Sequence, residues 1–254
     1  MASPTTYAVL LREAGQPNAE AVCRAFRQFR HLTDADAIRL AANAQGILMR
    51  HLNVDEAKAL QQALGAEGVN AALAKDDELR FLPSARRVHH AELSSDALLI
   101  FDHLNRALAV PWNEVSLVAA GAVPHVEISS SVQHPGVGIH SLFRSGARSA
   151  PRSQLETTRQ LVLELITRNA SARYEIHAHD FHFHRLPALP ATSLMERFVW
   201  LVREMSQRTT GAVLNRGVQD IRDGITLVRG YPSRQALLDE MVWLLWSEAH
   251  RRHG

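Results

Sequence analysis

Residues 53–73 read NVDEAKALQQALGAEGVNAAL, and this stretch predicts a helix followed by a strand. Asn53 followed three residues later by Glu56 is the capping-box pattern that opens a helix. Gly68 has the position of a glycine that ends one. The VNAALA run that follows is short and apolar, so we predict a buried strand there.

The residues before this stretch predict the rest of a β-α-α-β-α-β unit. YAVLLR (residues 7–12) is an apolar run suited to a strand. A first helix is expected in NAEAVCRAFRQFR, where apolar residues recur at helical spacing. Thr33 and Asp36 form a second capping pattern, which opens another helix that ends by Gly46. GILMRHL, which leads directly into Asn53, is then expected to form the middle strand.

Residues 20–73 resemble the C-terminal domain of the bacterial ribosomal stalk protein, and the two can be aligned without a gap. The positions that correspond to that domain's cap, core and turn residues are Asn53, Ala57, Leu60, Leu64, Gly68 and Val69. The resemblance implies a small α/β sandwich. The stalk family recruits translation factors through a loop that contains lysines. This chain has His31, Thr33 and Asp34 where that family has Gly, Gly and Leu, and it has no lysine there, so we expect the fold without factor recruitment.

Beyond Pro83, short β-rich runs separated by turn residues replace the helices. These runs are VHHAEL, ALLIFDH, ALAVPWNEVSLVAAG and HVEISSSVQ. LLIFDHLNRALAVPW predicts a hairpin that turns at Asn105-Arg106, and Trp112 marks a change from exposed to buried in the strand that follows. The pattern resembles bacterial pleckstrin-homology-like domains, in which a strand ending in IPW precedes another strand. The Gly-, Ser- and Arg-rich residues 134–153 depart from that pattern, and we interpret them as a mobile loop.

The last third of the chain predicts one more pair of strands and two helices. QLVLELIT reads as a strand buried on both faces, and RNASA as a turn. One helix is expected behind a Ser193/Glu196 cap and a second from Ser233, with LNRGVQDIRDG as the connection between them. The tryptophans expected to plug the core of the pleckstrin-like domain are Trp200, Trp243 and Trp246.

These patterns together predict an α+β protein of two domains. Residues 1–82 would form a stalk-protein-like (or ferredoxin-like) β-α-α-β-α-β module. Residues 86–254 would form a larger antiparallel, pleckstrin-like β domain with C-terminal helices. We place the boundary between Leu79 and Val88, and we expect limited proteolysis to cut there or within residues 144–153.

Composition argues against several classes of function. Lys and Arg number 28 against 26 Asp and Glu, and they are scattered rather than grouped with aromatics, so no nucleic-acid binding is expected. No apolar run approaches the roughly 20 residues that span a bilayer, and the start of the chain lacks a signal-peptide pattern. We therefore expect a bacterial cytoplasmic protein without membrane insertion. The single cysteine, Cys23, lies on the apolar side of its helix, and we interpret it as a buried thiol.

Residues 177–184 read HAHDFHFH and raise the question of a metal site. We expect this run to lie on strands. Residues two apart in a strand share a face, so His177 and His179 form one pair, and His182 and His184 form a second pair on the other side. Zinc requires three or four ligands that converge at about 2.0 to 2.1 Å, and strand neighbours supply at most two.

A turn at Asp180 is the alternative geometry for this run. It would place Phe181 and Phe183 in the core and leave the two later histidines in solvent. A metal would then need a third ligand from elsewhere, such as Asp180, His89 or His90, and nothing in the spacing requires one. We therefore interpret the histidines as surface residues.

No motif in the chain assigns a reaction. GxSxG, GxxxxGK[ST], GxGxxG, HExxH and CxxC are all missing. The carboxylate pairs Asp34/Asp36 and Asp76/Asp77 read as solvated surface groups. We predict no catalytic, cofactor-binding or metal-binding residues, and a non-catalytic module that binds an unidentified protein. Two alternatives stay open: a metal-dependent enzyme built on residues 177–184, and an accessory protein of the ribosome or of translation.

Overall fold

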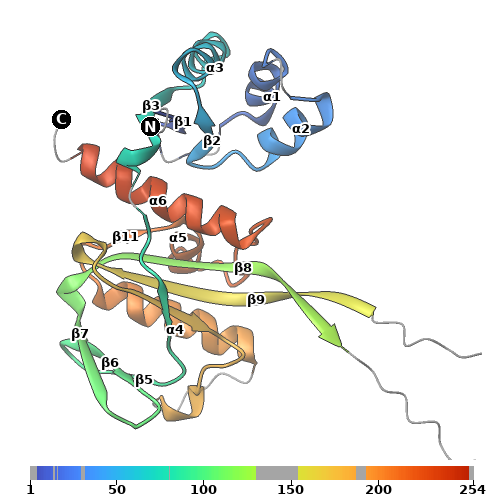
Figure 1. Cartoon of the computed structure of the whole chain (residues 1–254). Coiled ribbons are helices and arrows are strands. Elements are labelled where there is room, and N and C mark those ends of the chain that lie inside the picture. Colours follow the sequence, from blue (N-terminus) through green and yellow to red (C-terminus); the bar gives the residue numbers. More distant parts are fainter. Residues whose placement is uncertain are drawn as a thin grey trace, which may run out of the picture.

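The structure is a computed structural model that describes residues 5–13, 15, 17–29, 32–79, 81–129, 154–186 and 193–251. Both helices and sheets are present, which confirms the predicted α+β class. The strands within these ranges form three sheets, with helices packed between and beside them (Figure 1). The whole of the predicted loop at 134–153 lies outside the described residues, so its character stays a prediction.

The first sheet carries three helices on one side. The elements are β1 (Tyr7–Leu11), α1 (Ala19–Arg27), α2 (Asp34–Ala42), β2 (Ile47–Leu52), α3 (Val54–Ala66) and β3 (Ala71–Lys75). The strands are antiparallel in the order β2-β1-β3. Helix α2 begins after Thr33, whose side chain accepts a hydrogen bond from the Asp36 N–H, and α3 begins after a complete capping box of Asn53 and Glu56. Local side-chain caps therefore set both helix starts where the sequence predicts them.

The other two sheets are built from eight strands. Their bounds are β4 (Ala85–Arg87), β5 (Ala91–Leu93), β6 (Ala97–Phe101), β7 (Ala107–Pro111), β8 (Val115–Ser129), β9 (Gln154–Thr167), β10 (Arg173–His177) and β11 (Val213–Leu214). One sheet has the order β11-β8-β9-β10-β4 and the other β5-β6-β7. The β6–β7 hairpin turns through Asn105, as predicted, and Asn105 adopts a φ of 58°. Trp112 is buried at the start of a short 3₁₀ turn that leads into β8.

The C-terminal part contains three helices where the sequence predicts two. These are α4 (Leu194–Arg208), α5 (Arg216–Arg222) and α6 (Arg234–Arg251). Helix α5 lies inside LNRGVQDIRDG, so the expectation of a plain connection is wrong. Asn215 caps it by accepting a hydrogen bond from the Val218 N–H. Gly217 weakens helix propensity, but a Cβ there would lie 2.0 Å from the Ala120 carbonyl oxygen, so only glycine lets α5 approach β8 this closely.

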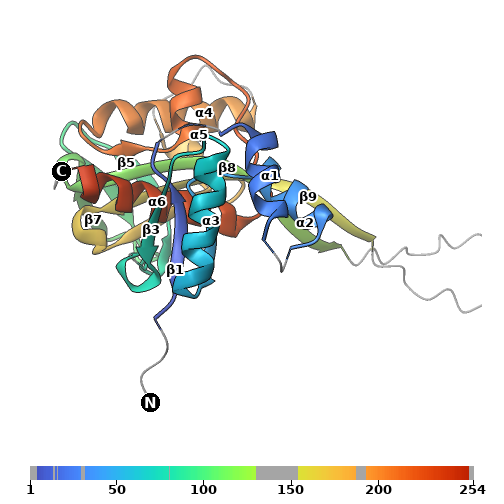
Figure 2. The ribbon, with the colours of Figure 1, turned by 90° about the horizontal axis from the view of Figure 1, so that it is seen from above.

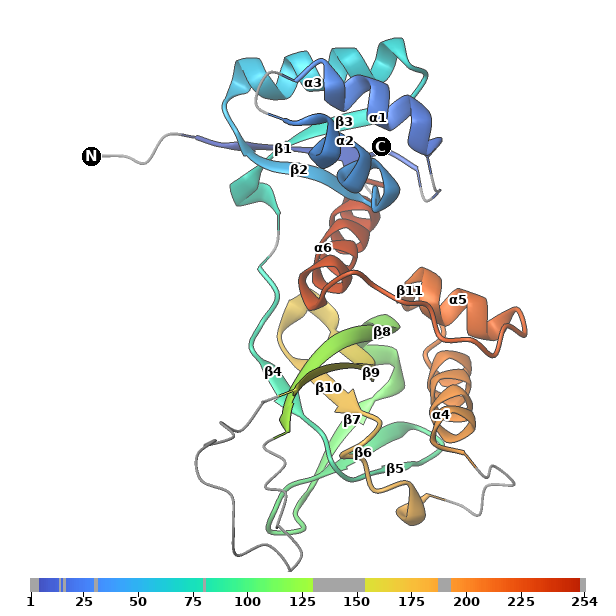
Figure 3. The same ribbon diagram turned by 90° about the vertical axis from the view of Figure 1, so that its right-hand side faces the viewer.

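Helix α6 lies between two sheets. Helix α4 covers one face of the five-stranded sheet, and α6 covers the other face (Figure 3). The three-stranded sheet β2-β1-β3 packs on the far side of α6, so residues of β1, β3, α6, β8 and β9 share one hydrophobic cluster. Seen from above, the N-terminal module overlies α6 (Figure 2). The C-terminal helix thus belongs to the cores of both halves of the chain.

Two of the three tryptophans occupy a different place from that expected. Trp200 packs against the α4 side of the sheet, whereas Trp243 and Trp246 belong to the cluster between the two sheets. The Trp243 Nε1–H donates to the Leu11 carbonyl oxygen at 2.7 Å, and its ring lies against Gly46. A hydrophobic cluster therefore crosses the predicted domain boundary, which itself stays a prediction.

None of the helices in the described ranges combines the length and the apolar composition that a membrane span requires.

Candidate functional site

The most polar buried region lies on the α6 face of the five-stranded sheet. The β9–β10 register places Glu175 opposite Glu164, and the β4–β10 register places Arg87 beside Glu175. Cross-strand neighbours share a face, so these charged side chains lie together on the α6 side of the sheet. Arg173, two residues before Glu175 on β10, faces the same way, and the first turn of α6 adds Arg234.

Glu164 is the centre of this network and has no exposed surface (0%). The Arg173 Nε and Nη2 groups donate to its two oxygens at 2.9 Å each, and Arg234 donates to Oε1 as well. Burial raises the pKa of the Glu164 carboxyl, while Arg173 and Arg234 act in the opposite direction. The pKa of Arg173 is raised overall, because the favourable interaction with Glu164 outweighs the lowering effect of burial. Because the two-pronged geometry is that of a carboxylate with a guanidinium, we take the pair as ionised.

His177 is buried at the end of β10 with 5% of its surface exposed. Its Nε2 contacts the Glu175 carboxylate and lies 3.3 Å from the Arg87 Nη2. Burial lowers the pKa of His177 to about 4, and Arg87 and Arg234 add to this lowering against the opposite effect of Glu175 and Asp180. The imidazole is therefore neutral at pH 7. Its Nδ1 has no hydrogen-bond partner among the described residues.

An open hollow of about 600 Å³ adjoins this network. Its walls come from β8, β9, β10, the turn after β10, β4 and the start of α6. The residues in the walls are Arg87, Val123, Pro124, His125, Thr158, Arg159, Gln160, Glu175, His177, His179, Asp180 and Arg234. Arg87 and Arg234 pair with Asp180 and Glu175, and Arg159 adds a third cation, so the hollow offers both donors and acceptors with a small excess of positive charge.

The histidine run does not form a continuous strand. Strand β10 ends at His177, and the chain turns through residues 178–180, where the Asp180 N–H donates to the His177 carbonyl at 3.1 Å. The expectation that all four histidines lie on strands is therefore wrong, and the alternative with a turn at Asp180 is the one the structure adopts. The physical reason is that Phe181 and Phe183 enter the core after the turn.

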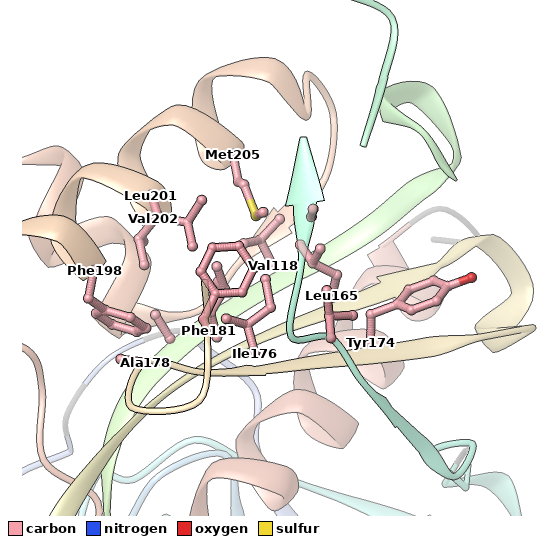
Figure 4. Close-up of a cluster of buried hydrophobic side chains, with 14 of the residues drawn as sticks. Val118, Leu165, Tyr174, Ile176, Ala178, Phe181, Phe198, Leu201, Val202 and Met205 are labelled. Carbon is pink, nitrogen blue, oxygen red and sulfur yellow. The ribbon is translucent and has the colours of Figure 1, made fainter. Parts of the chain in front are cut away.

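After the turn, the two phenylalanines lie in the core and the two later histidines lie at the surface, as a turn at Asp180 requires. Phe181 and Phe183 are buried, and Figure 4 shows the Phe181 ring among Val118, Ile176 and Phe198. His182, directly before a 3₁₀ turn, and His184, inside that turn, are exposed. The run therefore divides into one buried histidine, His177, which belongs to the polar network, and three surface histidines, of which His179 lies in the turn after β10.

The other candidate metal ligands are engaged separately. The His89 Nδ1 lies 3.4 Å from the Asp180 carbonyl oxygen, and the His90 ring stacks on Phe101 at 4.4 Å between centroids. Across the described residues, no group of three or more His, Cys, Asp or Glu could hold a metal ion.

The carboxylate pairs named from the sequence have local roles. A hydrogen bond from the Thr33 hydroxyl lowers the pKa of Asp36, which also pairs with Arg39 at 2.8 Å. Asp76 accepts from the backbone N–H of His51 at 3.1 Å. Asp34 and Asp77 are exposed. Cys23 is partly buried on α1.

Comparison with known proteins finds no protein-family model, no curated protein and no solved structure that matches this chain. The function therefore has to be argued from the chain's own geometry.

Sequence reasoning missed the polar network. Glu164 lies in the middle of the otherwise apolar QLVLELIT, and a carboxylate in a strand buried on both faces requires a cationic partner. That signal could have marked Glu164, but its partners Arg173 and Arg234 lie nine and seventy residues away along the chain.

Proposed function

We propose that this chain is a non-catalytic protein-interaction module that receives an extended segment of a partner protein along the free edge of β9. The observation that carries the proposal is the unequal length of β9 and β10. Strand β10 pairs with β9 only as far back as Val162, while β9 continues to Gln154 with β8 as its other neighbour. The resulting two-stranded ribbon extends beyond the rest of the sheet (Figure 1).

The direction of the backbone groups on β9 follows from one hydrogen bond. The Ala178 N–H donates to the Leu161 carbonyl oxygen at 3.0 Å, so the N–H and C=O of Leu161 face β10. Backbone groups of alternate residues point the same way in a strand, so those of Arg159, Thr157 and Leu155 face the open side. No described strand pairs with them there. Such a row of unpaired groups is a template for an added strand.

The polar hollow lies beside this edge and would receive side chains of the added strand. Thr158 and Gln160 of β9 line it together with His177 and Asp180. Backbone pairing supplies affinity in this mode of binding, and pockets beside the edge supply specificity. The mixture of donors and acceptors in the hollow favours a partner segment with polar, hydrogen-bonding side chains.

The finer fold assignment is part of the same proposal. The antiparallel strands β5 to β7 and β8 to β10 share one hydrophobic core with α4, which supports a pleckstrin-like arrangement. Strands β4 and β11 pair in parallel with their neighbours, which departs from a purely antiparallel barrel. The order of elements over residues 7–75 supports the stalk-like assignment of the N-terminal module.

Selection from a library of random display peptides tests the proposal with the full-length chain. The key variant is Thr157→Pro, because proline removes an N–H that faces the open edge while the β8 ladder keeps its own donors. Thr157→Val is the matched control, since it changes the side chain and keeps that N–H. We expect selected peptides to bind the parent and Thr157→Val alike, and to bind Thr157→Pro at least tenfold more weakly.

Hydrogen exchange supplies a second readout for the same experiment. Bound peptide should slow exchange of the Thr157 and Arg159 amides, which face the edge. A selection that enriches no peptide would overturn the proposal. So would peptides that bind the Pro and Val variants equally well.

A further inference from the structure

A second, smaller cavity lies where the N-terminal module meets α5 and α6. It holds about 120 Å³. Residues of the loop before β2, of the α5 start and of α6 form most of its wall, and those used below are Gln45, Arg216, Gln219, Glu240 and Trp243. The cavity is separate from the hollow beside β9.

Glu240 is the unusual residue of this wall, because it is a carboxylate with only 2% of its surface exposed. Its Oε2 accepts hydrogen bonds from the Tyr231 hydroxyl and, at 3.3 Å, from the Asn215 amide. Its Oε1 accepts only a long hydrogen bond of 3.4 Å from the Arg216 backbone N–H. No arginine, lysine or histidine in the described part of the chain forms an ion pair with Glu240. Arg229 interacts electrostatically with Glu240, but its guanidinium is paired with Asp220 at 2.7 Å. The Oε1 atom therefore stays weakly hydrogen-bonded, and it belongs to a residue of the cavity wall.

Arg216 provides the opposite charge in the same wall. It is the first residue of α5 and is partly buried, and its guanidinium has no ion-pair partner among the described residues. Its backbone contacts Glu240, but no ion pair joins the two side chains. The Gln219 side-chain N–H donates to the Leu214 carbonyl at 2.8 Å, so the side-chain oxygen of Gln219 remains as an acceptor. The wall of the cavity thus combines the weakly hydrogen-bonded Oε1 of Glu240, the Arg216 guanidinium without an ion pair among the described residues, and the apolar ring of Trp243.

We propose that this cavity binds a small zwitterion, specifically a free α-amino acid with a short side chain. Its ammonium group would pair with Oε1 of Glu240, and its carboxylate would pair with the Arg216 guanidinium. A cavity of about 150 Å³ can hold one benzene molecule, so 120 Å³ suits glycine or alanine and excludes a peptide. This site is independent of the proposed peptide edge.

Calorimetric titration of the full-length chain with glycine and with L-alanine tests the proposal. Methylamine and acetate serve as probes that carry only one of the two charged groups. Either amino acid should bind saturably, and each single-charge probe should bind at least about tenfold more weakly, because it leaves one wall charge unpaired. If neither amino acid binds, or if methylamine binds as well as glycine, the zwitterion site does not exist.

Substitutions separate the two wall charges. Arg216→Gln and Glu240→Gln should each weaken amino-acid binding by about tenfold or more. Arg222→Gln is the matched control, because Arg222 is exposed on the same helix and lies outside the cavity wall. Glu240 also supports the Tyr231 contact, so the Arg216 variant decides the matter if the Glu240 variant fails to fold. Binding by Arg216→Gln that equals binding by Arg222→Gln would refute the assignment.

Discussion

Trp243→Ala should destabilise both halves of the chain in a single transition. Trp243 lies on α6 with 5% of its surface exposed, in the cluster that joins the N-terminal sheet to β8 and β9. Its Nε1–H is bonded to the Leu11 carbonyl of β1. Gly46 has a φ of +60°, and a Cβ there would lie 2.7 Å from the Trp243 ring, so the ring is packed tightly against the N-terminal module.

Truncation of a buried aromatic ring to alanine costs on the order of 3 to 5 kcal/mol, which includes the cavity left behind. Domains have about 5 to 15 kcal/mol of total stability, so the loss is large enough to move the unfolding midpoint clearly. Trp243→Phe keeps most of the ring and removes the hydrogen-bond donor, so it should cost only about 1 to 2 kcal/mol. The ratio of the two effects separates packing from hydrogen bonding.

Urea denaturation with native-state hydrogen exchange measures this prediction. Slowly exchanging amides of β1 and of β10 report on the two halves separately, and both should lose protection by the same free energy in Trp243→Ala. The denaturant slope should stay that of the parent if the chain unfolds as one unit. The reasoning fails if the amides of one half lose protection and those of the other half keep it, because α6 would then not be a shared core.

Three further outcomes follow from the same packing. Replacement of His182 and His184 by Gln should change unfolding free energy by about 0.5 kcal/mol each, whereas Phe183→Ala should cost on the order of 3 to 5 kcal/mol in urea denaturation. A chelator-sensitive loss of several kcal/mol in the parent, missing from the glutamine variant, would instead indicate a metal. The native pKa of His177 is about 4 against an ordinary 6.5, so the unfolded chain binds more protons between these values. Stability should therefore fall by up to about 3 kcal/mol as pH drops from 6.5 to 4, and a His177→Gln variant with the same pH profile as the parent would contradict this. Asn215→Ala removes hydrogen bonds to the N–H and the carbonyl of Ala120 on β8 and to the Val218 N–H at the start of α5, so it should lower the free energy of unfolding by about 2 to 4 kcal/mol. A thermal midpoint equal to the parent's would refute this role of Asn215.

Features that depend on near neighbours in the chain were predictable from the sequence. Thr33, Asn53 and Ser193 each cap a helix through groups three residues away, so the helix starts could be located without tertiary information. The same holds for the β6–β7 hairpin and for the continuous burial of the QLVLELIT strand. In each case a short-range pattern contains the physical cause.

Features that depend on distant residues could not be predicted. Gly217 argues against a helix locally, yet α5 forms because the glycine lets it approach Ala120 of β8. Glu164 becomes an acceptable core residue only when Arg173 and Arg234 reach it from other elements. The position of α6 between two sheets likewise depends on β1, more than 200 residues earlier in the chain.

Local caps and periodicities thus define the helices and strands of this protein, whereas the candidate sites arise where separate elements end side by side. Among the described residues, no strand covers the far part of β9, because β10 ends at His177 and the chain then turns to bury Phe181. Glu240 borders a cavity because α6 meets α5 and the N-terminal module there. The β9 edge and the cavity beside Glu240 both depend on where neighbouring helices and strands end relative to one another. Relative position is set by packing the whole core at once, and the spacing of residues along the chain does not encode it.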